Sequence, residues 1–506
     1  MGVVGGVILD ESVIFEEEEG EESGSKGVVS LRAGAQSLLR KLRHSNIRTG
    51  ISYGVDLSAA KISLLKEMAT LYSYSFFSLG PSSIEDAVTN IMLVWNDIGG
   101  SVLYLASDHK KGICFKLSNC GWLIVFLGSS ASGDYISKLE EFPLTLCHLN
   151  RKAMGNNIVT IGYIMKPSRE EDFAKRGAFP MYPTPDGLMF LPLTFELPIS
   201  SQLQEVDVIL HKATDEIVSI ELTSSLETSS RITYTRGMEE LRRYLEHHPD
   251  HFAIDPLDNI YPILDRLVTQ QILLGLEDLN SEGRPTIRGP HFLKIDNFGD
   301  PDLAQRLSEA KLSLPIIVKP QVACGVADAH NMAIVFRVED FNDLTVPLPA
   351  VIQEYVDHSS TLYKFYALGE KIFYAVKKST PNTDVLMKLS EGNGLRPLIF
   401  DSLKSLPTGN QHSGDGISFK ANDKSVDLGL VTEAANWLRK MLDLTIFGFD
   451  VVIQEGSGDH VIVDVNYLPS FKEVPDNVAI PAFWDVIKKK FESKKKEQDI
   501  LIRNRK

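Results

Sequence analysis

The sequence VIVDVNYLP at residues 461–469 places two oxygen-bearing side chains, Asp464 and Asn466, inside an otherwise apolar run. Alternate residues of a β-strand share a face, so both groups should point the same way, about 7 Å apart along the strand. A second acid, Asp450, lies in the apolar run LTIFGFDVVI (444–453), and the glycine-containing segment EGSGD separates the two runs. This pattern predicts a β-hairpin that brings Asp450 close to Asp464.

Two carboxylates and an amide oxygen on one hairpin suit a hard cation. Proteins bind Mg²⁺ through one or two carboxylates, and water and substrate phosphate oxygens complete its shell at about 2.0–2.1 Å. The hairpin therefore indicates a phosphoryl-transfer or nucleotide site, with Asp450, Asp464 and Asn466 as candidate metal ligands. The alternative is that these acids only end their strands.

The chain is long and acidic. Its 506 residues suggest about three structural units. Its formal net charge of -15 argues against general nucleic-acid binding, which needs a basic surface. The acidic run EEEEGEE (16–22) predicts a solvated loop. An anionic ligand must therefore meet a local cluster of cations.

The four cysteines are scattered without a CxxC pair, which disfavours both a zinc site and a disulfide framework. They indicate reduced thiols in a cytoplasmic or nuclear protein. The stretch MGVVGGVILDES has no basic and apolar signal, and no segment reaches about 20 apolar residues. We therefore expect neither secretion nor a membrane span or membrane partner. The lysine-rich end of the chain is either a nuclear signal or a frayed helix end.

Residues 1–150 alternate short apolar runs with amphipathic stretches, which predicts a doubly wound α/β domain. The order resembles the haloacid dehalogenase-like fold, with Asp10, Ser52 and Asp108 at the ends of predicted strands. Phosphatases of that superfamily use the first-strand aspartate as nucleophile and a second acid two residues later as acid/base. Here the second position is Ser12. The resemblance therefore implies a catalytically inactive structural or docking module, with an unidentified protein partner, and an active phosphatase is the alternative.

The next part of the chain mixes strands and helices. NNIVTIGYIMKPSRE (156–170) predicts a strand leading into a turn. VDVILHKATDE (206–216) predicts a strand that ends in His211 and Lys212. RITYTRGMEELRRYLEHHP (231–249) predicts an amphipathic helix.

Two β-rich segments follow, at 315–378 and 446–468, and the turn-rich stretch 389–419 between them predicts a mobile loop. Lys319 ends a β-branched strand of the first segment, and Lys364 opens the strand that follows the linker QEYV. Either ammonium can reach nucleotide phosphates as a point charge. The backbone of the linker can pair with an adenine edge.

Six segments together resemble the ATP-grasp fold and, more narrowly, the inositol 1,3,4-trisphosphate 5/6-kinase family, also called inositol-tetrakisphosphate 1-kinases. In chain order they are GYIMKP, ILHK, IDPLDNIYPILDR, IIVKPQVACG with HNMAIVF, VIQEYVDHSSTLYKFYALG, and FGFDVVI with VIVDVNYLPSF. The resemblance is to a plant-like form with an extra N-terminal domain. It implies an α/β chain with a degenerate haloacid dehalogenase-like domain at 1–150, a substrate-binding part at 156–255, an ATP-grasp domain at 256–490 and a basic tail at 491–506.

The resemblance also implies a role for each matching residue. The expected catalytic residues are Lys319, Lys364 and Asp450, and the expected metal ligands are Asp450, Asp464 and Asn466. The residues expected to contact ATP are Arg266, Lys319, Gln353, Glu354, Tyr355, Val356, Lys364, Lys378 and Thr380. The residues expected to contact the inositol phosphate are Lys166, Arg169, Lys212, Cys324, His358, Lys364, Asn466 and Ser470.

Three positions depart from the family pattern. The family has a histidine that contacts the inositol phosphate at the position of Cys324, an arginine at Gln321 and a glycine at Ser470. A neutral thiol is a poor phosphate ligand, so binding, regiospecificity or rate should differ. The intact metal set and phosphate lysines favour a working kinase over an inactive homologue. His358 keeps the family's residue, in a segment that we expect to be an exposed loop.

The sequence thus predicts a monomeric, ATP- and Mg²⁺-dependent kinase of inositol polyphosphates, with two Mg²⁺ ions and ATP as co-substrate. The resemblance implies transfer to the 5 or 6 hydroxyl of inositol 1,3,4-trisphosphate, with tetrakisphosphate 1-kinase or phosphate-shuffling isomerase activity as further activities. Two alternatives stay open, namely another ATP-grasp enzyme that ligates a carboxylate, and a non-catalytic scaffold that binds inositol phosphates. His211 and Lys212, with the other predicted substrate cations, favour a polyanionic substrate over a carboxylate.

Overall fold

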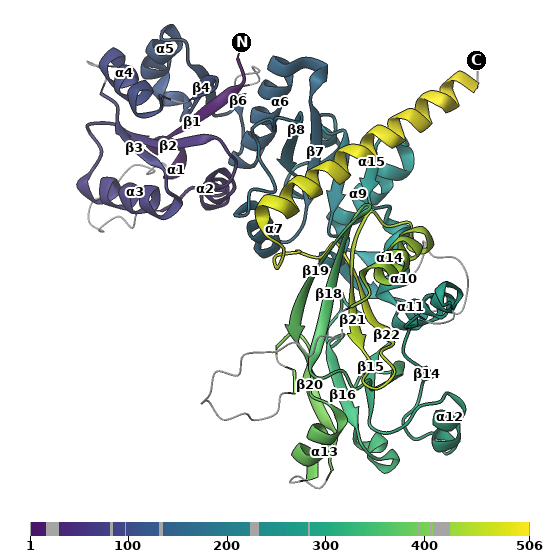
Figure 1. Cartoon of the computed structure of the whole chain (residues 1–506). Coiled ribbons are helices and arrows are strands. Elements are labelled where there is room, and N and C mark those ends of the chain that lie inside the picture. Colours follow the sequence, from purple (N-terminus) through teal and green to yellow (C-terminus); the bar gives the residue numbers. More distant parts are fainter. Residues whose placement is uncertain are drawn as a thin grey trace. The chain divides into compact units, whose positions relative to one another are not determined.

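The computed structural model describes residues 2–16, 30–80, 84–96, 98–130, 135–222, 232–281, 284–391, 395–404, 406–407 and 426–504. The chain forms two compact units (Figure 1). The first comprises Met1–Leu210 with Tyr244–Phe252, and the second comprises His211–Arg243 with Ala253–Lys506. The predicted domain boundaries at 150–156 and 255 do not coincide with this division. Of the predicted acidic loop, only Glu16 is described, and it is exposed.

The first unit begins with a six-stranded parallel sheet in the order β3-β2-β1-β4-β5-β6. Its central strands β1 and β4 are apolar and buried, as in parallel sheets that are covered on both faces. The direction of winding reverses between β1 and β4, where polar residues can gather beyond the carboxyl ends of the strands. The strands are β1 (Val4–Asp10), β2 (Arg48–Tyr53), β3 (Ser75–Ser78), β4 (Ser101–Ser107), β5 (Leu123–Leu127) and β6 (Tyr135–Ile136).

Helices cover both faces of this sheet (Figure 1). One core cluster includes Leu38, Leu65 and Phe142, from α2, α3 and α6, and the other includes Ile91 and Leu117, from α4 and α5. The doubly wound α/β fold that the sequence predicts for this region is confirmed. The helices are α1 (Glu11–Ile14), α2 (Ala35–Arg43), α3 (Ala59–Tyr72), α4 (Ile84–Val94), α5 (Lys111–Asn119) and α6 (Phe142–Met154).

A second sheet has the order β12-β9-β7-β8. Two sequence predictions in this region are wrong. Helix α7 replaces the turn expected after the strand at 159–164, because Pro167 stands at the first helical position, where a proline is well tolerated. The single helix expected at 231–249 is divided into strand β11 and helix α9. The elements are β7 (Val159–Ile164), α7 (Pro167–Ala174), β8 (Leu188–Pro192), α8 (Ile199–Leu203), β9 (Val208–His211), β10 (Ile217–Ile220), β11 (Ile232–Tyr234), α9 (Arg236–His247) and β12 (Phe252–Ile254).

Packing in the first unit crosses the predicted boundary after residue 150. The fully buried Asn150 accepts a hydrogen bond from the Val4 N–H at 2.7 Å and donates one to the Met181 carbonyl oxygen at 3.4 Å. The Met181 N–H donates to the Ser45 carbonyl oxygen at 2.8 Å, and the Met181 side chain lies in the core cluster that contains Leu38. The N-terminal domain therefore shares its core with the segment that follows it.

Replacing Asn150 by leucine is expected to lower the free energy of unfolding by about 3 kcal/mol, because two buried backbone groups lose their partner. Urea denaturation of the full chain measures the change. The matched control is Asn297→Leu at an exposed turn, where the amide oxygen accepts from the Gly299 N–H. The control should stay within about 0.5 kcal/mol. Equal effects of the two substitutions would contradict this role of Asn150.

The second unit contains two five-stranded sheets (Figure 1). One has the order β14-β17-β15-β16-β20 and is antiparallel throughout. The other has the order β13-β22-β21-β18-β19 and is antiparallel except between β13 and β22. The strands are β13 (Ile287–Arg288), β14 (Phe292–Ile295), β15 (Ile316–Pro320), β16 (Asn331–Val335), β17 (Ala350–Glu354), β18 (Thr361–Leu368), β19 (Lys371–Lys378), β20 (Leu398–Asp401), β21 (Ile446–Ile453) and β22 (His460–Tyr467).

One further expectation for the second unit needs correction. Strand β20 lies inside the stretch 389–419 that the sequence predicts as a mobile loop, and residues 392–394, 405 and 408–425 are outside the described part of the chain. Helix α15 runs through residues 490 and 491 without a break, so the basic tail continues a helix, and a helix end is one of the two interpretations that the sequence left open. The helices are α10 (Tyr261–Leu264), α11 (Arg266–Leu273), α12 (Leu303–Glu309), α13 (Thr383–Glu391), α14 (Leu428–Leu442) and α15 (Asp476–Asn504).

Among the described residues, no helix has the length and apolar character needed to cross a membrane. The four cysteines, all of which are described, carry free thiols, as the sequence predicts.

Candidate active site

The predicted metal hairpin forms. β21 and β22 pair antiparallel, with Asp450 opposite Asp464 and Gly448 opposite Asn466. The Asn466 Nδ2 donates a hydrogen bond to the Asp464 Oδ2 at 3.2 Å, so the two side chains share a face. A Cβ atom at Gly448 would lie 3.1 Å from the Pro469 side chain. Glycine at this position therefore lets the chain close over the hairpin just after Asn466.

Lys364 on β18 forms an ion pair with Asp450 on the adjacent strand β21. The register places Lys364 opposite Asp450, and the Lys364 Nζ lies 2.9 and 3.0 Å from the two carboxylate oxygens. Burial alone would lower the pKa of Lys364, but the Asp450 carboxylate outweighs burial and raises it. Burial, with the nearby Asp464 charge, raises the pKa of Asp450 to about 6 against the opposing effect of Lys364. At pH 7 both partners are therefore charged.

Lys319 reaches the same hairpin from the other sheet. Asp450 is opposite Asp464 but Val451 is opposite Ile462, so Val463 is the extra residue of a β-bulge. The Lys319 Nζ lies 3.4 Å from the Val463 carbonyl oxygen. Burial lowers the pKa of Lys319 to about 8. The lysine thus remains mainly protonated at pH 7 and adds a second cation beside the metal ligands.

Arg266, predicted to contact ATP, is buried and holds the loop after β15. Its Nη1 donates to the carbonyl oxygens of Pro320, Val322 and Ala329 at 2.6, 3.0 and 3.2 Å, and its Nη2 donates to that of Ala323 at 3.3 Å. The guanidinium therefore sets the path of the loop that carries Cys324. The ATP contact stays a prediction.

Gln321 and Cys324, the two residues of this loop that differ from the family pattern, have different surroundings. The Gln321 Nε2 donates to both oxygens of the buried Asp265 at 2.9 and 3.1 Å, so an amide pairs with that carboxylate where the family has an arginine. Cys324 is partly buried among Lys212, Arg266 and charged acids. Burial raises the pKa of its thiol, although both cations oppose the shift. Cys324 therefore adds no charge to the site at pH 7.

Lys212 lies beside the strand that carries the metal ligands. Its Nζ donates to the Tyr467 carbonyl oxygen and lies 5.2 Å from the centre of the Tyr467 ring. Burial lowers the pKa of His211 to about 4, and the His211 Nε2 lies 2.6 Å from the Asp255 carbonyl oxygen. The expectation that both residues of the pair are substrate cations is therefore wrong, because His211 is neutral and used inside the fold.

Protein contacts hold the side chains of the predicted adenine linker. The Glu354 carboxylate forms a two-point ion pair with Arg288 at 2.7 and 2.9 Å, and its backbone N–H donates to the His291 carbonyl oxygen at 2.9 Å. The Tyr355 hydroxyl lies beside Thr380, another residue that the sequence assigns to ATP. The Glu354 N–H is therefore used within the fold, and the adenine contacts of the whole linker stay predictions.

Two buried polar atoms near this linker lack a partner within the described part of the chain. They are the Gln353 Nε2 and the His358 Nε2. The His358 Nδ1 lies 2.6 Å from the Val356 carbonyl oxygen, and its side chain is buried. The expectation of an exposed loop histidine is therefore wrong. His358 lies against the linker, and its contact with the inositol phosphate stays a prediction.

The register of β19 places its last two residues, Lys377 and Lys378, on opposite faces of the sheet. Lys377 stands opposite Leu362, two residues before Lys364, and Lys378 is opposite the next residue outward. Directly opposite residues share a face of the sheet, and alternate residues along a strand do too. Lys377 therefore lies on the face of Lys364, and Lys378, predicted to contact ATP, is exposed on the other face.

Four residues not singled out from the sequence lie near this cluster. Tyr366 and Lys377 share the face of Lys364, and both contact Glu473. His330 ends the loop that Arg266 holds, and the Asp464 charge acts on it. Tyr366 could have been found from the sequence, because a residue two places after Lys364 on a strand shares its face. Glu473 could not, because its position depends on the geometry of a turn.

The remaining predicted substrate residues lie elsewhere along the chain. Lys166 is exposed at the N-terminus of α7, and Arg169 is partly buried in its first turn, both in the first unit. Ser470 is partly buried after Pro469 in the second unit. Their contacts with substrate stay predictions.

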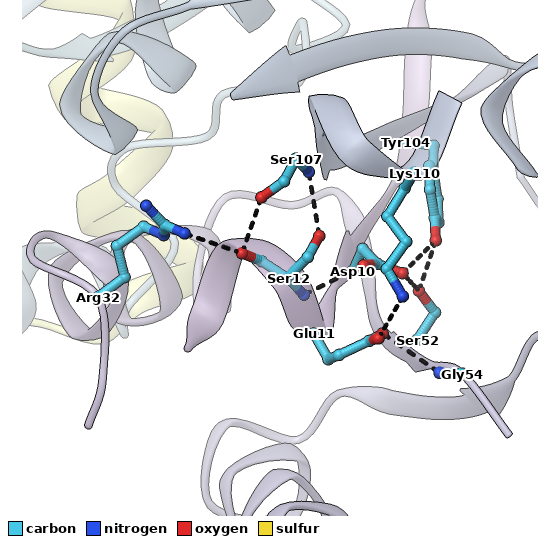
Figure 2. A network of polar contacts seen from close by, with 9 residues as sticks. All are labelled: Asp10, Glu11, Ser12, Arg32, Ser52, Gly54, Tyr104, Ser107 and Lys110. Atoms are coloured by element: carbon cyan, nitrogen blue, oxygen red, sulfur yellow. Dashed lines mark hydrogen bonds and ion pairs between the residues drawn. The ribbon is translucent and has the colours of Figure 1, made fainter. Parts of the chain in front are cut away.

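The N-terminal domain has its own polar cluster at the carboxyl ends of β1 and β4 (Figure 2). The Asp10 Oδ2 accepts hydrogen bonds from the Tyr104 hydroxyl at 2.5 Å and from the Ser52 hydroxyl at 3.3 Å. Burial raises the pKa of Tyr104, so the phenol stays protonated and remains a donor. The carboxylate at the nucleophile position is thus covered by protein groups.

Ser12, which stands where the phosphatases have their second acid, also bonds to other groups of the domain (Figure 2). The Ser12 Oγ accepts from the Ser107 N–H at 3.0 Å, and the Ser12 carbonyl oxygen accepts from the Ser107 hydroxyl at 2.9 Å. Glu11 pairs with Lys110 at 2.7 Å, and burial raises the pKa of Glu11 to about 7. These contacts use the groups at positions 11 and 12 within the fold, and the absence of phosphatase activity stays a prediction.

Known proteins resemble both parts of the chain. Residues 1–152 match the family model "ITPK4, N-terminal HAD-like domain", and residues 281–485 match the "Inositol 1,3,4-trisphosphate 5/6-kinase ATP-grasp domain". The chain is 49% identical over 496 residues to inositol-tetrakisphosphate 1-kinase 6 of Oryza sativa subsp. indica, covering 97% of this chain and 90% of that protein. The chain belongs to the inositol-tetrakisphosphate 1-kinase family.

Other relatives of this kinase family member are more distant. It is 28% identical over 296 residues to inositol-tetrakisphosphate 1-kinase of Danio rerio, covering 57% of this chain and 69% of that protein. Among solved structures, D-alanine–D-alanine ligase from Bacillus anthracis is similar at 14% identity and a TM-score of 0.38, covering 68% of this chain and 99% of that one. The predicted combination of a haloacid dehalogenase-like domain with an ATP-grasp kinase module is thus confirmed by the family.

The ATP-grasp kinase fold implies ATP and, typically, Mg²⁺, and the residues of this family member fit both. Among the described residues, no group of three or more His, Cys, Asp or Glu could hold a metal alone. Asp450, Asp464 and Asn466 supply two carboxylates and an amide oxygen, so water and ATP phosphate oxygens would complete the shell of Mg²⁺, as is usual for this ion. The Gln353 Nε2 and the His358 Nε2, which have no partner among the described residues, leave polar atoms for a nucleotide at the linker.

Proposed function

We propose that this chain is an ATP- and Mg²⁺-dependent kinase that phosphorylates inositol polyphosphates. The main support is the grouping of Lys364, Asp450, Asp464 and Asn466 on one face of β18, β21 and β22, with Lys319 arriving from the other sheet. Transfer of a γ-phosphoryl group to a hydroxyl depends on positioning and charge neutralisation more than on covalent help. Cations beside oxygen ligands for a hard metal supply both requirements.

Each side chain has a role in the proposed reaction. Lys319 and Lys364 bind phosphate oxygens and offset the charge that develops on the transferred group. Asp450, Asp464 and Asn466 hold Mg²⁺, which supplies further charge neutralisation when it is bound. The attacking hydroxyl must release a proton. Lys364 contacts both oxygens of Asp450, so no general base is assigned.

The ion pair between Lys364 and Asp450 suggests an exchange of partners. A carboxylate has lone pairs for both a metal ion and an ammonium, but a metal ion held by Asp450 would weaken the attraction of that carboxylate for Lys364 and would repel the ammonium. The Lys364 Nζ would then be free to turn toward the phosphates. Lys364 acts as the counter-ion of Asp450 before the nucleotide binds and as a phosphate ligand afterwards.

The finer features of the proposal come from the family resemblance. They are transfer to the 5 or 6 hydroxyl of inositol 1,3,4-trisphosphate, 1-kinase action on tetrakisphosphates, isomerase activity, and two Mg²⁺ ions. A monomeric state and a cytoplasmic location, with the nucleus as a second location, also remain part of the proposal. The scaffold alternative draws support from Cys324, because its thiol replaces a phosphate-binding imidazole.

Product analysis tests the proposal. Purified protein is incubated with Mg-ATP and a panel of inositol tris- and tetrakisphosphates, and anion-exchange chromatography resolves the products. A more phosphorylated species is expected, and it should vanish in Asp464→Ala. If no isomer gives a product although ATP and inositol phosphates bind, the scaffold would replace the kinase as the function.

The Cys324→His substitution tests the departure from the family. It is expected to raise kcat/KM for the inositol phosphate about tenfold, since one hydrogen bond to a charged group is worth about 1.5 kcal/mol or more. Steady-state kinetics measures the change, and Cys120→His in the N-terminal domain is the matched control. Unchanged or lower activity would show that the missing imidazole does not limit turnover.

A further inference from the structure

Glu473 binds two side chains that belong to the face of the catalytic sheet. Its carboxylate accepts a hydrogen bond from the Tyr366 hydroxyl and forms an ion pair with the Lys377 Nζ. Tyr366 is two residues after Lys364 on β18, and Lys377 stands opposite Leu362 on β19. One carboxylate therefore links both strands on the face that carries Lys364.

The segment that carries Glu473 is held in place. It follows the metal strand β22, and the fully buried Phe471 in it packs on Phe483 of α15, with ring centres 5.6 Å apart. The Val474 N–H donates to the Phe471 carbonyl oxygen at 3.1 Å, which closes a turn around Glu473. The Glu473 side chain is only 20% exposed. Its position is therefore set by the core as well as by the ion pair.

The charge of Glu473 acts on the site. Burial opposes ionisation, but the bonds from Lys377 and Tyr366 hold the pKa of Glu473 below its usual value, so it is an anion at pH 7. Its negative charge is among the influences that raise the pKa of Lys364. Glu473 thus neutralises one cation of this face, Lys377, and lies within electrostatic reach of the lysine proposed to bind phosphate.

We propose that Glu473 is a specificity-determining residue that limits how many phosphates the inositol substrate carries. It does so by engaging Lys377, which would otherwise be a phosphate ligand, and by repelling an additional phosphate near Lys364. This inference rests on the proposed function. The substrate class that it favours is an inositol phosphate of lower charge.

The test compares inositol 1,3,4-trisphosphate with inositol 1,3,4,5-tetrakisphosphate, which has the same three phosphates and one more. Dissociation constants for both are measured by calorimetry on the full chain without ATP, because the tetrakisphosphate is also the product of the proposed transfer to the 5 hydroxyl. Glu473→Gln keeps an acceptor for the Tyr366 hydroxyl but removes the charge. It is expected to shift the ratio of the two dissociation constants about fivefold to tenfold toward the tetrakisphosphate, with the KM for ATP unchanged.

Lys377→Met provides an independent second variant. It leaves the Glu473 charge without its counter-ion and is expected to shift the preference toward the trisphosphate. Combined with Glu473→Gln, it should return the preference close to that of the unchanged chain. The matched control is Asp485→Asn, which removes the carboxylate that pairs with Lys371 at 2.9 Å and with Lys489 at 3.1 Å. This control should leave the preference unchanged.

The possible outcomes separate the inference from the proposed function. An unchanged ratio of the two dissociation constants in Glu473→Gln overturns the inference, even if the enzyme turns over. If Glu473→Gln shifts the ratio of the two dissociation constants as expected but the unchanged chain forms no product, the kinase proposal is overturned. The selectivity assigned to Glu473 then still holds. Failure of both inositol phosphates to bind overturns both.

Discussion

Replacing Lys364 by methionine is expected to lower kcat about 10²–10³-fold, the loss typical when one preorganised electrostatic donor is removed from an active site. Methionine keeps the unbranched shape and the apolar part of the side chain. It removes the ammonium that lies 2.9 Å from Asp450 and that is proposed to bind phosphate during transfer. Steady-state kinetics with Mg-ATP and the preferred inositol phosphate measures this loss.

The same substitution is expected to tighten the binding of Mg²⁺ in the absence of ATP. Asp450 and Asp464 face each other across the hairpin, and without Lys364 the Asp450 carboxylate loses its ion-pair partner. Calorimetric titration with Mg²⁺ alone measures the affinity. Slower turnover with tighter Mg²⁺ binding distinguishes the proposed exchange of partners from a general loss of structure, which would weaken both.

Lys371→Met is the matched control for this experiment. Lys371 lies on the adjacent strand β19, and its Nζ pairs with Asp485 at 2.9 Å. Exposed ion pairs of this kind contribute little to stability, so turnover and Mg²⁺ affinity should not change. A Lys364→Met enzyme with more than about a tenth of the original kcat would contradict the role assigned to Lys364.

The second large effect is expected for Arg266→Met, which should lower the free energy of unfolding by about 4 kcal/mol. The guanidinium donates to four carbonyl oxygens of one loop, and its loss leaves buried acceptors unpaired, each at a cost of about 1–3 kcal/mol if it finds no other partner. Urea denaturation measures the stability. The KM for ATP should also rise, because the loop follows directly from Lys319 on β15.

These measurements separate two roles of Arg266. If the arginine acted only as an ATP ligand, Arg266→Met would raise the KM for ATP and leave the unfolding transition unchanged. The matched control is Arg439→Met on α14, where the side chain is partly exposed and bonds to the Asn436 amide oxygen at 3.2 Å. That substitution should change stability by less than about 1 kcal/mol.

Local patterns in the sequence were sufficient for much of the site. The hairpin with Asp450, Asp464 and Asn466 follows from the two-residue period of a strand, a short turn and two apolar runs. The position of Lys319 at the end of a strand has the same local origin. The doubly wound N-terminal domain is also predictable, because alternating strands and helices restrict the topology strongly.

Other features depended on contacts between distant residues. Arg266 resembles a nucleotide ligand in the sequence, yet its donors serve a loop more than 50 residues away. His211 resembles a substrate cation, but burial makes it neutral. Neither outcome has a local signature, because hydrogen-bond partners and burial are set by which segments pack together.

Which residues carry oxygen ligands and cations, and which elements hold them, could be predicted from the chain alone, since the periods of strands and helices are local properties. Three pairings required the folded structure: Lys377 rather than Lys378 shares the face of Lys364, Glu473 holds Lys377, and Asn150 joins two predicted domains in one core. Register, turn geometry and burial decide such pairings, and a shift of one residue in register would move every side chain to the opposite face.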